Sequence, residues 1–438
     1  MISGPDTPPQ ARGMSPLGGA VRWYVLGMMS LVYAINIADR YVVSTVLESI
    51  RLDLDLTDTS VAFLTGSALA IFYVTVSIPI SMLADRRSRR NIVAASLFFW
   101  SLMTLACGFV HSSWQLMLAR IGVGVGESGA TPASTALIAD YFRPLERPMA
   151  MTVFTLGAPL GAWLGSDLAG RVADVHGWRA AFVVLGVPGM LLAIILLLTV
   201  REPRRAALDG DGAAVEPVTL RETLTYLRGN RAAIHLMMAG AITALWGWGL
   251  LWWAPTYFVR AFDMSTGEIG VALGAAHLIA GVGVTLLASW VMSWRRMRRP
   301  RTILWAMAGF VALSTIPSIL MPLATSRGHA LAMLWAFLPA IYFYIGPSIG
   351  LLQNAVPVAM RAQATAISVL MGNLTNLVFA PLLVGVLSDL FGGAGGASAQ
   401  SLRWALVILS LTGFWAAYHY WAAARGFEDR SVLPATSA

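Results

Sequence analysis

Four ionisable residues lie within long apolar segments of this 438-residue chain: Asp39, Arg40, Arg120 and Glu127. A charge at the middle of a bilayer costs on the order of 3 kcal/mol even on lenient insertion scales, so such residues usually face a cavity and pair with one another. Carboxylates and guanidinium groups in such a cavity are suited to binding a charged substrate group and to carrying a proton. We therefore predict that these four residues bind substrate and protons.

Helix geometry predicts which of the four residues meet. With a rise of about 1.5 Å per residue, Asp39 lies about 13 Å and Arg120 about 9 Å below the same face of the membrane. Glu127 lies seven residues after Arg120, so it projects from the same helix face at a depth of about 20 Å. We expect Asp39 to pair with Arg120, and Glu127 to lie deeper with fewer partners. The alternative is a purely structural ion pair that locks two helices together.

The second half of the chain carries aromatic rather than charged residues in its apolar segments. Trp246 and Tyr344 are predicted to line an apolar wall opposite the charged residues, and Asn36 and Asn373 to add neutral hydrogen bonds there. An interfacial aromatic belt is the competing interpretation of these tryptophans and tyrosines. His277 could titrate near neutral pH, but we interpret it as a packed histidine.

Residue types argue against other chemistries. The glycine-rich segment 122–129 resembles a dinucleotide-binding loop, but such a loop follows a strand, whereas these glycines interrupt an apolar span and favour close helix packing. All 30 basic residues are Arg, so no phosphate-binding loop with a Lys exists. The single Cys107 and the few His residues form no metal or nucleophile pattern. We predict no enzyme activity, no cofactor and no nucleic-acid partner.

Membrane-spanning helices must position these residues. Hydrophobic residues make up 57% of the chain and charged residues 12%, about half the charged fraction of a soluble protein. Several apolar stretches exceed the roughly 18 to 20 residues that span a bilayer. We predict an all-α membrane protein with twelve transmembrane helices in two six-helix bundles. The expected helices cover residues 22–47, 59–84, 91–110, 114–139, 148–170, 179–199, 232–259, 268–293, 302–323, 331–356, 363–388 and 402–424.

The distribution of Arg residues predicts the orientation. Short loops and tails on one side of the membrane hold 22 Arg, and those on the other side hold six. Because positive loops stay in the cytoplasm, we expect both termini to be cytoplasmic. The use of Arg alone as basic residue indicates the codon bias of a GC-rich, bacterial genome, so we expect the inner membrane of a bacterium. We expect no cleavable signal peptide. The predicted parts are a tail (1–21), a first bundle (22–200), a linker (201–231), a second bundle (232–424) and a tail (425–438).

Three motifs resemble those of the major facilitator superfamily. The segment 81–90, SMLADRRSRR, is similar to the family signature G-x-L-A-D-R-x-G-R-R, with serines at both glycine positions. Arg120 matches the Arg of the family's fourth helix, and segment 157–161, GAPLG, matches its fifth-helix Gly-Pro motif. The resemblance implies a carrier with two bundles that works by alternating access. The family pattern also implies a cytoplasmic gate, formed by Asp85, Arg86, Arg89, Arg90 and Arg147.

The segments 36–40, NIADR, and 126–128, GES, resemble the Spinster-like branch, whose members export lysophospholipids and sphingosine phosphate. The resemblance implies proton-linked transport of a lysolipid-like amphipathic substrate, with Asp39, Arg120 and Glu127 as the polar and proton-responsive residues. The alternative is an organic anion or drug transporter of the same fold, since organic anion symporters carry similar patterns. A channel or an intramembrane enzyme is less favoured. We expect a monomer.

Overall fold

The computed structural model describes residues 19–68, 70, 72, 75–76, 88–143, 146–202, 218–292 and 299–427. Ten of the helices in this part of the chain are long and apolar enough to cross a membrane. Helices are the expected solution, because lipid offers no hydrogen-bond partner to the backbone. Of the twelve predicted spans, the second (59–84) lies only partly within the described residues, and the fourth is broken into two shorter helices.

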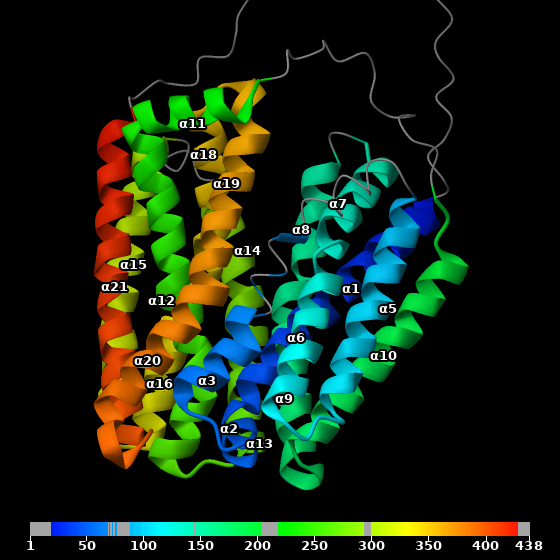
Figure 1. The fold of residues 1–438 in the computed structure, drawn as a ribbon. Helices are drawn as coiled ribbons and strands as arrows, with labels where there is room; N and C mark the ends of the chain where they lie inside the picture. The colour runs from blue at the N-terminus through cyan, green and yellow to red at the C-terminus, as the bar shows by residue number, and fades with distance from the viewer. Residues whose placement is uncertain are drawn as a thin grey trace, which may run out of the picture.

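The chain folds into two helical bundles (Figure 1). The N-terminal bundle contains α1 (Gly19–Thr45), α2 (Leu47–Asp53), α3 (Asp58–Ala62), the π-helical turn η1 (Phe63–Ser67), α5 (Arg89–Cys107), α6 (Ser113–Glu127), α7 (Ala130–Tyr141), α8 (Arg147–Thr155), α9 (Gly157–His176) and α10 (Trp178–Thr199). The C-terminal bundle contains α12 (Arg231–Phe262), α13 (Thr266–Ala276), η2 (His277–Gly281), α14 (Val282–Met292), α15 (Pro300–Leu323), α16 (Arg327–Phe337), α17 (Pro339–Phe343), α18 (Ile345–Ala355), η4 (Val358–Met360), α19 (Arg361–Asn373), η5 (Leu374–Phe379), α20 (Ala380–Gly392), η6 (Gly393–Gly395) and α21 (Ala399–Gly426).

The fourth predicted span was expected to be one helix, and the structure corrects this. Helix α6 ends at Glu127, a turn covers Ser128 and Gly129, and α7 then begins. Pro132 explains the break, because a proline ring clashes with the carbonyl group four residues earlier, which here belongs to Ser128. The break places the carboxylate of Glu127 at the end of a helix in the interior of the bundle.

The segment between the bundles was expected to be a solvated linker, but its last part is a helix. Helix α11 (Leu220–Gly229) begins with a capping box, in which Thr219 and Glu222 satisfy each other's backbone N–H groups. It lies across one end of the C-terminal bundle (Figure 1). The hydroxyl of Tyr226 donates a hydrogen bond to the carbonyl oxygen of Ala355 at 3.3 Å, which fixes α11 to that bundle.

Glycines allow close packing within and between the bundles. A Cβ atom at Gly161 of α9 would overlap the carbonyl oxygen of Ala34, so α9 packs directly on α1. Further along α9, Gly170 lies against Gly270 of α13, which joins the two bundles. The bundles meet at the end that carries α2, α3 and α13, and diverge toward the end that carries α11 (Figure 1). We call these the network end and the linker end.

Candidate functional site

The predicted ion pair between Asp39 and Arg120 is present in the N-terminal bundle. Arg120 Nη1 donates to Asp39 Oδ2 at 2.8 Å, and the two side chains are 1% and 3% exposed. The hydroxyl of Thr104 on α5 donates to the other oxygen of Asp39. Three helices therefore meet at one carboxylate, and each partner compensates for the cost of burying the other charge.

The expectation that Glu127 has few partners is wrong, because Arg40 reaches it. Arg40 Nη2 and Nε donate to Glu127 Oε2 at 2.8 and 3.2 Å. The long Arg side chain spans the difference in depth between the two backbone positions. Glu127 is fully buried, and its Oε1 has no hydrogen-bond partner among the described residues. The Arg40 side chain keeps 18% of its surface exposed, so it is the most accessible of the four predicted residues.

Aromatic residues of both bundles meet around Tyr41, which directly follows Arg40 in α1. The ring of Tyr41, on α1, lies 4.6 Å from the His277 ring and 6.3 Å from the Trp248 ring. His277 Nδ1 is 2.9 Å from the hydroxyl of Tyr342. The Tyr41 hydroxyl and His277 Nε2 are both buried and have no partner among the described residues. The packed histidine that we predicted is thus present, but one of its ring nitrogens is left without a hydrogen bond.

The prediction that Trp246 lines the cavity wall is wrong. Its indole nitrogen donates to Ser318 Oγ at 3.0 Å, its ring packs on Phe337, and it is fully buried inside the C-terminal bundle. The side chains of Trp246 and Trp248 leave the helix in different directions, because two residues correspond to about half a turn. Trp248 contacts the other bundle instead.

The other three predicted neutral residues have different environments. Asn36 is 4% exposed, and its side-chain nitrogen has no partner among the described residues. Tyr344 is 8% exposed and lies between the short helices α17 and α18 of the C-terminal bundle. Asn373 is half-buried and ends α19, where the π-helical turn η5 begins. Asn36 is therefore the best placed of the three to bind a ligand, because it is buried with an unused donor.

The predicted cytoplasmic gate is described only in part, since Asp85 and Arg86 lie outside the described residues. Arg89 pairs with Asp140 of α7, and its backbone N–H donates to Glu202 at 2.9 Å. These partners belong to the N-terminal half of the chain. Arg90 and Arg147 likewise donate to backbone carbonyl groups of this half, namely those of Val200, Ala139 and Phe142.

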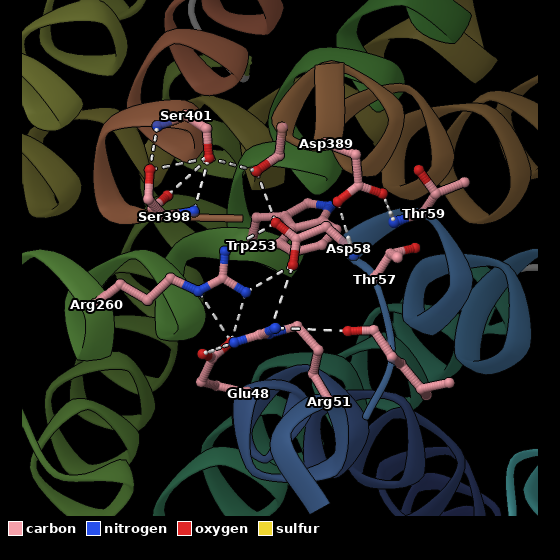
Figure 2. A network of polar contacts seen from close by, with 12 residues as sticks. Glu48, Arg51, Thr57, Asp58, Thr59, Trp253, Arg260, Asp389, Ser398 and Ser401 are labelled. Carbon is pink, nitrogen blue, oxygen red and sulfur yellow. Dashed lines mark hydrogen bonds and ion pairs between the residues drawn. The ribbon is translucent and has the colours of Figure 1, made fainter. Parts of the chain in front are cut away.

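The described residues reveal an ionic network that sequence reasoning missed, at the network end (Figure 2). Arg260, near the end of α12, donates to Glu48 Oε2 at 2.6 Å and to Asp58 Oδ1 at 2.6 Å. Arg51 donates to the second oxygen of Glu48 at 2.8 Å. Arg260 belongs to the C-terminal bundle and both carboxylates belong to the N-terminal bundle, so the pairs hold the two bundles together.

A third carboxylate joins the bundles beside this network (Figure 2). Asp389 of α20 accepts hydrogen bonds from the backbone N–H groups of Asp58 and Thr59, at 3.1 and 2.8 Å. It thus caps the N-terminus of α3, where the helix dipole favours negative charge. Ser388 donates to Asp58 Oδ2 at 2.6 Å. A Cβ atom at Gly385 would overlap the Asp58 carbonyl oxygen, so the backbones themselves are in contact here.

The charge of Glu48 is stabilised in this network. Burial alone would raise the pKa of Glu48, but hydrogen bonds and charge from Arg51 and Arg260 lower it below its ordinary value. Glu48 is therefore ionised at neutral pH and available to Arg260. The stability that ionised Glu48 adds to the folded protein is fully present above the ordinary pKa of a glutamate, and it is lost as the pH falls through the lowered pKa. The network should hold at physiological pH and weaken only in acid.

Comparison with known proteins decides the family. The model of the Major Facilitator Superfamily matches residues 29–380. The chain belongs to this superfamily. Its fold and apolar helices make it an integral, multi-pass membrane transporter of small molecules, not an enzyme.

Individual relatives include several kinds of transporter. An MFS-type efflux pump of Mycolicibacterium smegmatis is 31% identical, over 93% of this chain and 94% of the pump. A probable L-galactonate transporter of Escherichia coli is 26% identical, over 87% and 85%. Protein spinster homolog 1 of Bos taurus is 28% identical, over 83% and 72%.

Structural comparison points to the Spinster branch. A bacterial homolog of the human lysosomal transporter Spinster, in an inward-facing and unoccupied conformation, has a TM-score of 0.83 at 25% identity. The match covers 95% of this chain and 100% of that one. The superfamily transporter described here is therefore Spinster-like, as its motifs predicted.

Proposed function

We propose that this transporter moves an anionic amphipathic substrate, such as a lysophospholipid or a sphingolipid-like molecule, by proton-linked alternating access. The observation that carries the proposal is the pair of ion pairs in one bundle. Asp39–Arg120 is sealed from solvent, whereas Arg40 of the second pair remains partly exposed. Arg40 is thus the group that an anionic head group would reach.

The pair between Arg40 and Glu127 offers a physical route to proton coupling. A substrate phosphate is a bidentate partner for a guanidinium group and would compete with Glu127 for Arg40. Once Arg40 turns to the substrate, Glu127 is a buried carboxylate without its cation. A buried group in that situation is stabilised by becoming neutral, so substrate binding and protonation of Glu127 favour each other.

The aromatic residues that meet where the two bundles contact each other suit the rest of an amphipathic molecule. Trp248 and Tyr342 are half-buried and their ring centroids are 6.4 Å apart. Aromatic side chains provide a large apolar surface for a hydrocarbon chain. The unused polar atoms of Asn36, Tyr41 and His277 are available to hydroxyl or ester groups near the head group.

The closed network end fits one state of an alternating-access cycle. We infer that the network of Glu48, Asp58 and Arg260 closes the outer side, and that the gate with Asp85 closes the cytoplasmic side in the opposite state. This assignment places both termini in the cytoplasm of a bacterial inner membrane. The distribution of Arg residues and the likeness to an inward-facing structure support it.

We expect Glu127→Gln to flatten the pH dependence of transport. The amide keeps a hydrogen-bond acceptor for Arg40 but cannot take up a proton, so the variant should fold and bind substrate. The measurement is lysolipid uptake by proteoliposomes between about pH 5.5 and 8. Glu268→Gln is the matched control, because Glu268 forms an exposed ion pair with Arg327, with side chains 46% and 47% exposed. A pH profile of Glu127→Gln identical to that of the wild type would remove Glu127 from proton coupling.

We expect His277→Phe to raise the KM for the substrate by ~10-fold, the loss of about one hydrogen bond. The phenyl ring keeps the contact with Tyr41 but removes both ring nitrogens. His277→Gln, which retains a donor and an acceptor, should restore most of the affinity. Initial uptake rates over a range of substrate concentrations give the KM. Equal KM values for His277→Phe and the wild type would show that His277 only packs.

An organic anion or drug is the second candidate substrate, favoured by the likeness to an efflux pump and a probable L-galactonate transporter. The two candidate substrates differ in whether they need an apolar surface for binding: a lysolipid carries a hydrocarbon chain, and galactonate does not. Proteoliposomes loaded with a labelled lysolipid, with galactonate or with a cationic dye separate them. We expect saturable flux of the lysolipid alone. Saturable flux of galactonate or dye without lysolipid flux would transfer the function to the second candidate.

A further inference from the structure

A concave site lies at the linker end of the C-terminal bundle. It has a volume of about 1300 Å³. Its walls come from α11, the start of α12 and the end of α21, and are formed by Thr219, Arg221, Glu222, Thr225, Tyr226, Gly229, Asn230, Arg231, Ala232 and Gly426. These residues are distinct from the substrate and gating residues described above.

Two cations in this site have no counterion among the described residues. Arg221 and Arg231 are exposed, and their side chains make no hydrogen bond or ion pair with another described residue. Each lies in the first turn of a helix, α11 and α12 respectively. A positive charge there opposes the helix dipole, so both positions carry an electrostatic cost that a bound anion would offset.

The one carboxylate in the site is already engaged. Glu222 Oε2 accepts hydrogen bonds from the backbone N–H and the hydroxyl of Thr219, at 2.8 and 2.9 Å. These bonds lower the pKa of Glu222, so the residue stays ionised at neutral pH as part of the helix cap. The carboxylate therefore serves the cap, while Arg221 and Arg231 remain free to bind an anion from outside the protein.

Aromatic side chains indicate that this site lies at the level of lipid head groups. On α21, Tyr418 and Trp421 are 53% and 39% exposed, within about two turns of the helix end at Gly426. The guanidinium group of Arg425 stacks on Trp421 at 3.6 Å. Exposed Trp and Tyr gather where the bilayer meets water. Leu220 and Leu224 of α11 are also exposed, as in a helix that lies in this interface.

We propose that this site binds the phosphate of an anionic bilayer phospholipid, with Arg221 and Arg231 as the ligands and the face of α21 with Tyr418 and Trp421 along the acyl chains. The lipid would hold α11 against the membrane and against the C-terminal bundle. This role is independent of the transported substrate, because the site is not lined by any residue of the substrate cluster.

Native mass spectrometry of the detergent-purified full chain, with added phosphatidylglycerol or phosphatidylcholine, tests the proposal. Wild type should retain phosphatidylglycerol preferentially, and Arg221→Gln/Arg231→Gln should lose ~5-fold in retention for each arginine removed. Arg228→Gln is the matched control, because Arg228 is exposed on the same helix but does not line the site. It should behave as wild type.

Two further arms keep the outcomes distinct. Should the double variant fail to fold, Arg231→Lys and Arg221→Gln are measured singly. Arg231→Lys should retain the lipid, and Arg221→Gln should retain less of it. Inorganic phosphate added at millimolar concentration should neither compete with the lipid nor raise the Tm. Equal retention by wild type and the Gln variants, or stabilisation by inorganic phosphate alone to the extent of the lipid, overturns the proposal.

Discussion

Arg120→Ala is expected to abolish transport and to destabilise the protein by about 3–5 kcal/mol. The substitution leaves Asp39 as a buried carboxylate that is 3% exposed and retains only the Thr104 hydroxyl as a partner. The charge pair connects α1 to α6. Because α1 also carries Arg40, loss of the pair should displace this substrate-binding residue as well. The measurements are lysolipid flux in proteoliposomes and the Tm of the purified protein.

A double variant separates stability from transport. Asp39→Asn/Arg120→Gln replaces the buried charges by amides that can hydrogen-bond to each other, so it should regain much of the lost Tm. It should still fail to transport, since the field that positions Arg40 and Glu127 is gone. Wild-type flux in Arg120→Ala would show that the pair has no part in the mechanism. A transporting double variant would make it a purely structural pair.

Arg260→Gln is expected to open the network end. Arg260 is the cation shared by Glu48 and Asp58, and its side chain is 7% exposed. Without it, Glu48 and Asp58 lose their cation from the other bundle and keep only Arg51, which belongs to their own bundle. A loss of about 2 kcal/mol, which is typical for a hydrogen-bonded charge, shifts a two-state equilibrium ~30-fold. The variant should therefore favour the state open at the network end and slow turnover.

Cysteine accessibility measures this shift. Ser44 is 3% exposed, and its hydroxyl donates to the carbonyl oxygen of Trp252 across the bundle interface at 2.8 Å, so Ser44→Cys reports opening. The background is favourable, because Cys107 is buried and is the only cysteine. Arg327→Gln is the control, since Arg327 pairs with Glu268 within one bundle. Unchanged labelling in Arg260→Gln would remove this network from the gate.

Acid should have the same direction of effect as Arg260→Gln. Glu48 has a lowered pKa, so its attraction to Arg260 is complete at neutral pH and fades only when the pH falls through that value. Labelling of Ser44→Cys should therefore rise in acid, below the ordinary pKa of a glutamate.

The fold followed from the sequence because lipid leaves few options. Long apolar runs must be helices in a bilayer, and ten of the expected spans are present in the described part of the chain. Two local features were missed although the sequence carried their signals. Pro132 marks the break after Glu127, and the pattern from Thr219 to Glu222 is a capping-box signature within a polar segment that we interpreted as linker.

Contacts in the site could be predicted where they depend on the depth of the backbone positions in the membrane. Contacts that depend on side-chain length or on tertiary packing could not be predicted. Counting residues along two helices brought Asp39 level with Arg120. The same count left Glu127 isolated, because it ignored the reach of Arg40. The network of Glu48, Asp58 and Arg260 lies at helix ends, where charges commonly only set orientation. Arg260 is more than 200 positions away from both carboxylates in the sequence.

Lysolipid uptake driven by an imposed pH gradient tests whether this transporter couples lysolipid movement to protons. Proteoliposomes containing wild type, Asp39→Asn or Glu127→Gln are given a labelled lysophospholipid with and without a gradient. We expect saturable uptake by wild type that changes with the gradient, gradient-insensitive uptake by Glu127→Gln, and no uptake by Asp39→Asn. Lysolipid movement that is the same in wild type, Asp39→Asn and empty liposomes would contradict this expectation.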